Sequence, residues 1–198
     1  MMRAMNELAL LRQQLKERLL PPDFLPVELA RIRQAAVTIL LREQREKAEI
    51  LIIKRADHPN DPWSGHLALP GGRADESDPH LLATAARETW EEVGIKLDYE
   101  NHYVGRLETL LPVNPRLPKI EITPMIAITT QEVTLELSDE VANAFWMPVQ
   151  SLRESGLSDV FRFKTPEAIL KYPAYPSPFG PIWGITQRIL TEFLSFVE

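Results

Sequence analysis

The chain has 198 residues, of which 44% are hydrophobic and 25% are charged, and these proportions are typical of one globular domain with an ordinary core. Its formal net charge of −6 argues against a broad surface for nucleic acid or for an anionic membrane. The sequence contains no cysteine, which excludes disulfides, thiolate catalysis and cysteine-type zinc sites. No apolar run approaches the roughly 18 residues of a membrane span, and no signal-peptide core opens the chain, so we expect a cytoplasmic protein.

The first part of the sequence predicts a helix and a connector. Leucines at three- and four-residue spacing predict an amphipathic helix over residues 1–20, which Pro21 and Pro22 end. This helix is expected to pack either on the domain or on a second subunit, and the second alternative would make the protein a homodimer. We assign the helix and connector to residues 1–34 and the main domain to residues 35–198.

Strands are expected on both sides of a central helix. Apolar, β-branched runs predict an antiparallel strand pair, followed by a short strand that leads into a glycine turn. The predicted strands are 35–41, 49–55, 66–69, 99–111, 120–130, 144–147 and 160–164, and the predicted helices after the first are 79–93, 148–154 and 182–196. This order predicts an α+β fold or a three-layer α/β/α sandwich with a mixed sheet.

The central helix, residues 79–93, has clear end signals and two different faces. Asp78 is a favourable N-cap, Pro79 fits the first helical position, and Gly94 fits a left-handed C-terminal position. At 100° per residue, the face that we expect to be buried carries Leu82, Ala83, Ala86, Thr89, Trp90 and Val93.

Three glutamates, Glu88, Glu91 and Glu92, gather on the opposite face. Each like-charge contact costs roughly a few tenths of a kcal/mol, and the negative end of the helix dipole adds a similar penalty. Arg87, four residues before Glu91, offsets only part of this. A bound hard cation would relieve the repulsion, and carboxylate oxygens suit Mg²⁺ or Mn²⁺. The alternative is a solvated acidic face with no ligand.

The central segment resembles the signature of the Nudix hydrolases, Gly-x5-Glu-x7-Arg-Glu-x-x-Glu-Glu-x-Gly followed by an aliphatic residue. The matching residues are Gly72, Asp78, Arg87, Glu88, Glu91, Glu92, Gly94 and Ile95. Asp78 stands where the family usually has Glu, and eight residues rather than seven separate it from Arg87. These departures resemble the branch of coenzyme A pyrophosphatases, and the segments 51–55, 65–72 and 182–186 are also similar to that branch.

The resemblance implies a Nudix fold, with a central mixed β-sheet flanked by helices, and metal-dependent hydrolysis of a diphosphate linkage. It makes Glu88 and Glu92 the main ligands of Mg²⁺ or Mn²⁺, with Glu91 and the carbonyl of Gly72 as additional ligands. Arg87 would orient the carboxylates through its fork of donors. The general base would be Glu88 or a downstream acid, for which Glu140 is our candidate.

The substrate implied by the resemblance is a small nucleotide-derived molecule, with coenzyme A or its thioesters first. Arg55 and Arg73 are expected to bind its phosphates, because arginine grips phosphate bidentately. ADP-ribose, NADH and nucleotide sugars are the alternative substrates for the same chemistry. A different alternative is a Nudix-fold nucleotide-binding module without catalysis, although such a module would be expected to lose the carboxylates that this chain keeps. Nucleic acid and membranes are not expected as partners.

Overall fold

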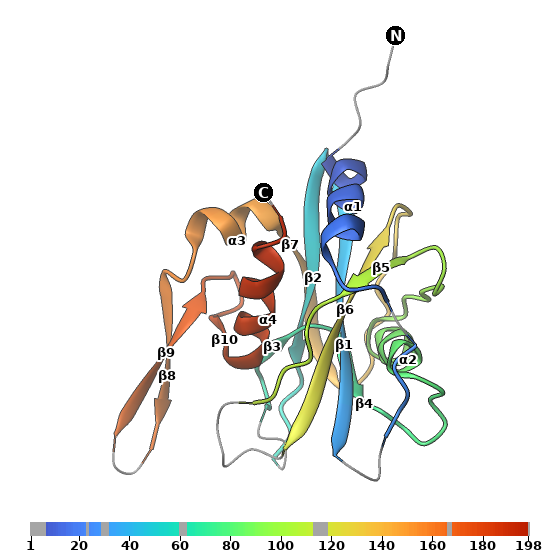
Figure 1. Ribbon diagram of the computed structural model, residues 1–198. Coiled ribbons are helices and arrows are strands. Elements are labelled where there is room, and N and C mark those ends of the chain that lie inside the picture. Colours follow the sequence, from blue (N-terminus) through green and yellow to red (C-terminus); the bar gives the residue numbers. More distant parts are fainter. Residues whose placement is uncertain are drawn as a thin grey trace.

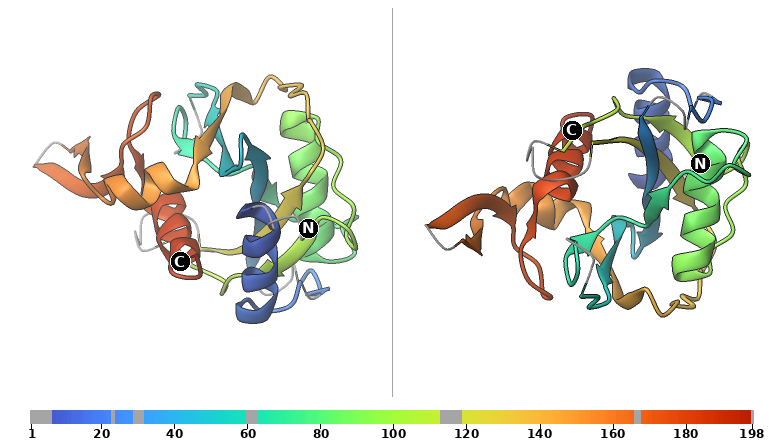
Figure 2. Two further views of the ribbon diagram at one scale, coloured as in Figure 1. Left: turned by 90° about the horizontal axis from the view of Figure 1, so that it is seen from above. Right: turned by 90° about the horizontal axis from the view of Figure 1, so that it is seen from below.

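A mixed seven-stranded β-sheet forms the centre of the molecule, and helices cover both of its faces (Figures 1 and 2). The computed structural model describes residues 7–22, 24–28, 32–59, 63–112, 119–165 and 168–197. This arrangement confirms the predicted α/β/α sandwich with a mixed sheet. In the described part of the chain, no helix has the length and apolarity that crossing a membrane requires.

The sheet is built around the long strand β1 (Arg33–Gln44). It pairs in parallel with β6 (Ile120–Thr129) along ten residue positions and antiparallel with β2 (Lys47–Arg55) at its end. The two residues between β1 and β2, Arg45 and Glu46, both have positive φ angles, of 50° and 65°. A two-residue turn of this kind matches the twist of a hairpin, so the predicted strand pair is confirmed but its connection is a tight turn.

The strands β1 and β2 separate beyond the pair Leu41 and Ile50, and two short strands continue the sheet there. β4 (Gly71–Arg73) pairs with the first part of β1, while β3 (Leu67–Ala68) pairs with the last part of β2. The segment that we predicted as a glycine turn is therefore a strand, and it holds its backbone next to the central helix.

The remaining strands widen the sheet, and the helices form the two outer layers. β5 (Tyr103–Arg106) pairs with β6, and β7 (Val141–Pro148) pairs with β2. One face of the sheet is covered by α2 (Leu81–Val93). The other is covered by α1 (Glu7–Arg18) and α4 (Gly184–Leu194), so the first predicted helix packs on the domain.

Two hydrophobic cores lie on opposite faces of the sheet, as the alternation of β1 shows. Ile39 and Leu41 belong to the core under α1 and α4, whereas Ala36 and Leu40 belong to the core under α2. All four side chains are fully buried. They divide between the two cores because successive side chains of a strand point to opposite faces of the sheet. Both sides of the sheet are thus buried, which fixes the position of α2 against β1 and β4.

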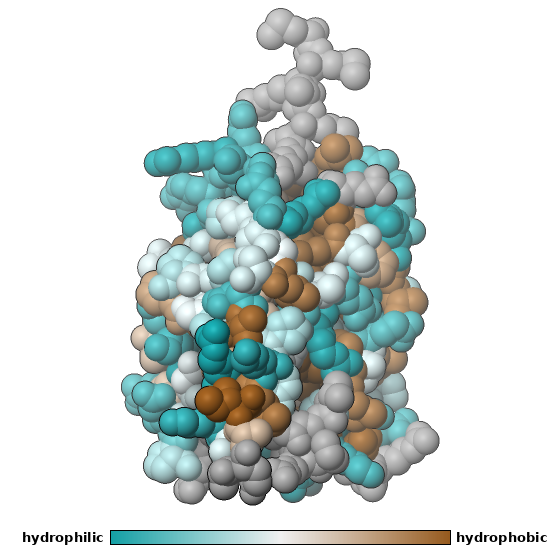
Figure 3. Space-filling model, turned by 90° about the vertical axis from the view of Figure 1, so that its left-hand side faces the viewer, coloured by the Kyte–Doolittle hydropathy of each residue, from teal (hydrophilic) through white to brown (hydrophobic). Residues whose placement is uncertain are grey.

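A second, three-stranded sheet follows the short helix α3 (Val149–Ser155) and projects from the body of the molecule (Figure 1). It contains β8 (Asp159–Lys164), β9 (Ile169–Tyr175) and β10 (Ile182–Trp183). β8 was predicted, but β9 was not, because Pro173 within it is unfavourable for a strand. On the side from which this sheet projects, apolar side chains reach the surface among polar ones (Figure 3).

Candidate active site

The helix α2 begins two residues later than we predicted, at Leu81. Its N-cap is His80, whose Nδ1 accepts a hydrogen bond of 3.0 Å from the backbone N–H of Ala83. The prediction that Asp78 caps this helix is wrong, because the Asp78 carboxylate has other partners. The predicted end is confirmed: Gly94 adopts the left-handed conformation with φ of 74°, and its N–H bonds to the helix.

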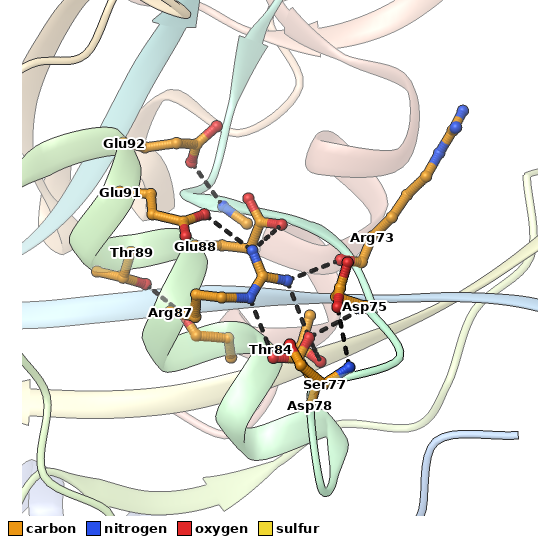
Figure 4. Close-up of polar contacts among 12 residues, drawn as sticks. Arg73, Asp75, Ser77, Asp78, Thr84, Arg87, Glu88, Thr89, Glu91 and Glu92 are labelled. Carbon is orange, nitrogen blue, oxygen red and sulfur yellow. Dashed lines mark hydrogen bonds and ion pairs between the residues drawn. The ribbon is translucent and has the colours of Figure 1, made fainter. Parts of the chain in front are cut away.

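Asp78 instead anchors Arg87 (Figure 4). The Nε and Nη2 atoms of Arg87 donate to the two carboxylate oxygens of Asp78 at 3.0 and 2.9 Å. Thr84 Oγ1 and the backbone N–H of Asp75 donate to the same carboxylate, each at 2.9 Å. Only 7% of Asp78 is exposed. Burial by itself would raise the pKa of Asp78, but the hydrogen bonds outweigh it and the pKa lies below its ordinary value.

The remaining donors of Arg87 face the glutamates. Nη1 donates to Glu88 at 2.9 Å and to Glu91 at 2.8 Å, and Nη2 donates to the carbonyl of Arg73 at 3.0 Å. The hydrogen bonds to Asp78 are the main reason that the pKa of Arg87 is raised. The guanidinium therefore joins the loop before the helix to two carboxylates on the helix. Its position is far more constrained than that of an arginine that pairs only with a glutamate one helical turn away.

Glu92 lies on the other side of this network and is only 3% exposed. Its Oε2 accepts a hydrogen bond of 2.8 Å from the N–H of Gly71, and its Oε1 lies 3.9 Å from Nη1 of Arg55. The expected division of the helix faces is wrong at two positions, since Glu92 is buried and Trp90 is 49% exposed. Helical periodicity could not reveal this, because β4 and β2 supply the polar partners that allow Glu92 to be buried.

Burial, together with neighbouring carboxylates, raises the pKa values of Glu92 and Glu88. Burial is the main cause that raises the pKa of Glu92 to about 8, and the charges of Glu88 and Glu140 add to it. Burial likewise raises the pKa of Glu88, with Glu91 and Glu140 contributing, although Arg87 acts in the opposite direction. Both carboxyl groups thus keep their protons to a higher pH than an exposed glutamate does.

Two glycines allow the strand β4 to lie against these carboxylates. A Cβ atom at Gly72 would overlap the carboxyl group of Glu88. At Gly71 the φ angle is 151°, and a Cβ atom would overlap the carbonyl of Ala36 on β1. A larger residue at Gly72 would push the strand away from the helix, and one at Gly71 would push it away from β1, so the Gly71-Gly72 pair sets the spacing of the site.

Glu140 reaches the cluster through a segment that caps the C-terminus of α2. The backbone N–H groups of Glu136 and Ser138 donate to the carbonyls of Val93 and Glu92, at 3.0 and 3.1 Å. These bonds satisfy carbonyls that a helix end otherwise leaves open. The carbonyl of Glu140 then accepts from the N–H of Ala56 at 2.8 Å, next to Arg55 on β2.

The two predicted phosphate-binding arginines differ in their positions. Arg55 faces the carboxylate cluster, as its distance to Glu92 shows. Arg73 is exposed, and its side chain extends away from the glutamates in Figure 4. A further cation of the loop after β5, Arg116, lies outside the described residues.

The donor set of the cluster suits a hard divalent cation in its chemistry. Glu88 and Glu92 offer carboxylate oxygens, their pKa values are raised by burial and by neighbouring carboxylates, and Gly72 leaves the Glu88 carboxyl directly beside the backbone. Glu91, 48% exposed at its side chain, is held by Arg87. Within the ranges that the structure describes, three or more Asp, Glu or His side chains do not converge in metal-binding geometry.

The structure has the features that the resemblance to the Nudix hydrolases implied. A helix that bears carboxylates follows a glycine strand, and the mixed sheet lies between two helical layers. The sequence profile of the NUDIX domain matches residues 32–165, and the chain belongs to this family. A protein of Yersinia pestis named as the Nudix hydrolase NudL is 32% identical over 170 residues, which cover 84% of this chain and 80% of that protein. The NudL of an Enterobacter species is 37% identical over 125 residues, 62% of each chain.

Other relatives are longer than the matched region. An uncharacterized protein of Schizosaccharomyces pombe is 39% identical over 107 residues, 52% of this chain, and the chain spans only 32% of that protein's length.

Among solved structures, a MutT/nudix family protein of Enterococcus faecalis matches with a TM-score of 0.60 at 20% identity, covering 96% of this chain and 70% of the other. The NUDIX domain of Shewanella oneidensis NrtR, solved with ADP ribose, matches with a TM-score of 0.50 at 21% identity, covering 61% and 75%. These structures confirm the Nudix fold.

Proposed function

We propose that the protein is a metal-dependent diphosphatase that hydrolyses the diphosphate linkage of a nucleoside diphosphate derivative. The observation that carries this proposal is the carboxylate cluster beside Gly71-Gly72. Glu88 and Glu92 are drawn from α2, Glu140 from the segment before β7, and the burial and repulsion that they share raise the pKa of Glu92 to about 8. A divalent cation beside these carboxyl groups would favour their charged forms and so lower their pKa values.

In this proposal Glu88 and Glu92 hold Mg²⁺ or Mn²⁺, with Glu91 and the carbonyl of Gly72 as further ligands. The bound ion would supply charge neutralisation on the phosphate oxygens of the substrate. Arg87 keeps the carboxylates oriented through its bonds to Glu88 and Glu91, and Asp78 keeps Arg87 in place. A preorganised arrangement of this kind costs no rearrangement during the reaction.

The chain offers two candidates for the group that takes the proton of the attacking water. Glu140 is the stronger one, because its charge acts on both Glu88 and Glu92, whereas Glu88 is already hydrogen-bonded to the guanidinium of Arg87. The carboxylate of Glu140 would accept the proton as the water attacks the phosphorus atom. Arg55, which faces Glu92, would bind a phosphate of the substrate, and Arg73 would do so only after turning toward the cluster.

Coenzyme A or its thioesters are the substrates that we place first. The support is Asp78 at the position of the first family glutamate, together with the eight residues that separate it from Arg87. In the structure both carboxylate oxygens of Asp78 accept hydrogen bonds from Arg87. The aspartate at this position of the signature therefore has a specific partner. ADP-ribose, NADH and nucleotide sugars form the second candidate group, and the Shewanella NUDIX domain was solved with the first of these.

A turnover screen tests the proposal. Purified protein is incubated with Mg²⁺ or Mn²⁺ and with coenzyme A, ADP-ribose, NADH or a nucleotide sugar, and the products are separated by chromatography. Hydrolysis of a diphosphate linkage that EDTA abolishes is the expected result, with coenzyme A the best substrate. If none of these compounds is hydrolysed, a nucleotide-binding module without catalysis is the better account.

The cytoplasmic location and a homodimer through α1 stay predictions. Sedimentation of the full chain tests the homodimer.

A further inference from the structure

Two buried threonines join the acidic helix to the central strand of the sheet. Thr38 on β1 and Thr89 on α2 are both fully buried. Oγ1 of Thr89 lies 2.7 Å from the carbonyl oxygen of Ala85 and 2.9 Å from Oγ1 of Thr38, and Oγ1 of Thr38 lies 3.3 Å from the same carbonyl oxygen. Both hydroxyls therefore have hydrogen-bond partners inside the core, and the three groups form one defined polar contact between helix and strand.

Thr38 also holds the start of the glycine strand through its backbone. Its N–H donates to the carbonyl of Pro70 at 2.7 Å, and the neighbouring position of the ladder pairs Val37 with Gly71. Pro70 directly precedes Gly71, whose N–H donates to the carboxylate of Glu92. One residue of β1 is thus bonded by its backbone to the residue before β4 and by its hydroxyl to α2.

Both bonding partners of Thr38 lie close to the groups of the candidate site. Thr89 directly follows Glu88 in the chain and is about 4.5 Å from Glu92 along the helix axis. On the other side, Pro70 is two residues from Gly72, where a Cβ atom would overlap the Glu88 carboxyl group. A small shift of α2 along β1 would therefore change the distance of both carboxylates from the backbone of β4.

We propose that Thr38 and Thr89 are positioning residues, whose hydroxyl contact sets the distance between the carboxylates of α2 and the backbone of β4. This inference rests on the proposed function, because that distance would decide how Glu88, Glu92 and the carbonyl of Gly72 meet one divalent ion. Apolar side chains of the same shape would fill the space, but apolar packing is non-directional. A hydrogen bond has a preferred length and angle, so it fixes the helix at one position along β1.

Valine and serine substitutions separate the hydroxyl from the shape of the side chain. Thr38→Val and Thr89→Val keep the branched shape and remove the hydroxyl, whereas Thr38→Ser and Thr89→Ser keep the hydroxyl and remove the methyl group. In each valine variant the remaining hydroxyl keeps the Ala85 carbonyl as its acceptor, so no buried donor is left unpaired and the fold should be retained.

The first measurement is the dissociation constant of Mn²⁺, obtained by calorimetry without substrate. Thr38→Val should bind Mn²⁺ about tenfold more weakly than the wild type, the lower end of the effect of losing a group that orients metal ligands. Thr89→Val should be affected less, because the Thr38 hydroxyl keeps its contact of 3.3 Å with the carbonyl of Ala85 on the helix. Both serine variants should bind Mn²⁺ as the wild type does.

The second measurement needs no metal. Amide hydrogen exchange, followed by NMR in the metal-free protein, reports on the N–H of Gly71, which donates to Glu92 at 2.8 Å. This N–H should exchange several-fold faster in Thr38→Val than in the wild type and in Thr38→Ser. Thr191→Val is the matched control, since it removes a hydroxyl contact of 2.9 Å between α4 and Tyr175 on the other side of the main sheet. It should change neither the Mn²⁺ constant nor the exchange of Gly71.

Three results would overturn the inference. They are a Thr38→Val protein that matches the wild type in both measurements, serine variants that are affected as strongly as the valine variants, or an equal effect of Thr191→Val. The proposed function fails in a different way. A wild-type protein that binds no Mn²⁺, but whose Gly71 N–H loses protection in Thr38→Val alone among the Thr38 variants, would refute the metal site and keep the positioning contact.

Discussion

Replacing Asp78 by Asn is expected to destabilise the protein, because it removes the charge that holds Arg87. Asp78 is 7% exposed and accepts hydrogen bonds from both Nε and Nη2 of Arg87, from Thr84 and from the backbone of Asp75. Asparagine keeps one acceptor oxygen but turns an N–H₂ group toward a donor. The Arg87 guanidinium would then lose its main partner while it stays close to Glu88 and Glu91.

The magnitude follows from the burial of the two partners. Removing one partner of a fully buried ion pair costs about 3–5 kcal/mol, and each hydrogen bond to a charged group contributes about 1.5–3 kcal/mol. The Arg87 side chain is 27% exposed, and Glu88 and Glu91 still bind it, so part of the loss is recovered. We expect the free energy of unfolding to fall by about 2–4 kcal/mol.

Urea unfolding monitored by circular dichroism measures this loss, and Asp75→Asn in the same loop is the matched control. The exposed Asp75 carboxylate accepts from the N–H of Ser77 at 2.9 Å, a bond that asparagine can keep, so its urea midpoint should stay at the wild-type value. Because the folded pKa of Asp78 is below that of the unfolded chain, its contribution is present at neutral pH and is lost as the pH falls through the folded pKa. The gap between wild type and Asp78→Asn should therefore narrow in acid. Equal midpoints for the two variants at pH 7 would refute the anchoring role.

Three further predictions concern the carboxylate cluster. Gly72→Ala would place a Cβ atom into the Glu88 carboxyl group, so turnover should fall by at least about tenfold, as kcat measurements with a competent substrate would show. The pKa of Glu92 is about 8, against 4.5 ordinarily, so the metal-free protein should lose stability as the pH rises from 4.5 to 8, by up to about 1.4 kcal/mol per unit. Thermal unfolding should show this loss, with Mg²⁺ restoring stability at pH 8 and not at pH 5; a flat profile would contradict it. If Glu140 is the general base, Glu140→Gln should lower kcat by about 10²–10⁴ with little change in KM, and an unchanged kcat would assign the proton to Glu88.

The local signals of the sequence predicted the sheet and the acidic helix, but not the contacts that come from distant strands. Gly94 ends α2 as expected, since a left-handed position near the last turn is a local requirement. The burial of Glu92 depends on the N–H of Gly71 and on Arg55, which are 21 and 37 residues away in the chain and are brought in because β4 and β2 each pair with β1. Helical periodicity therefore placed Glu92 in solvent and Trp90 in the core.

The role of Asp78 shows the same limit in a more local setting. By residue type it suited the N-cap, and that prediction used only the residues next to it. His80 takes the cap instead, because the Asp78 carboxylate is turned toward Arg87 on the second turn of the helix. The family signature, in which eight residues stand between Asp78 and Arg87 here, was the signal that linked the two positions.

The most direct test of the central claim is the turnover and stability of Glu92→Gln measured together. The variant removes a buried charge, keeps the shape of the side chain and leaves an oxygen to accept from Gly71. With coenzyme A and Mn²⁺ at pH 8, kcat should fall by orders of magnitude, while the metal-free variant unfolds at a higher temperature than the wild type. Turnover at the wild-type rate would remove Glu92 from the metal site and contradict the account.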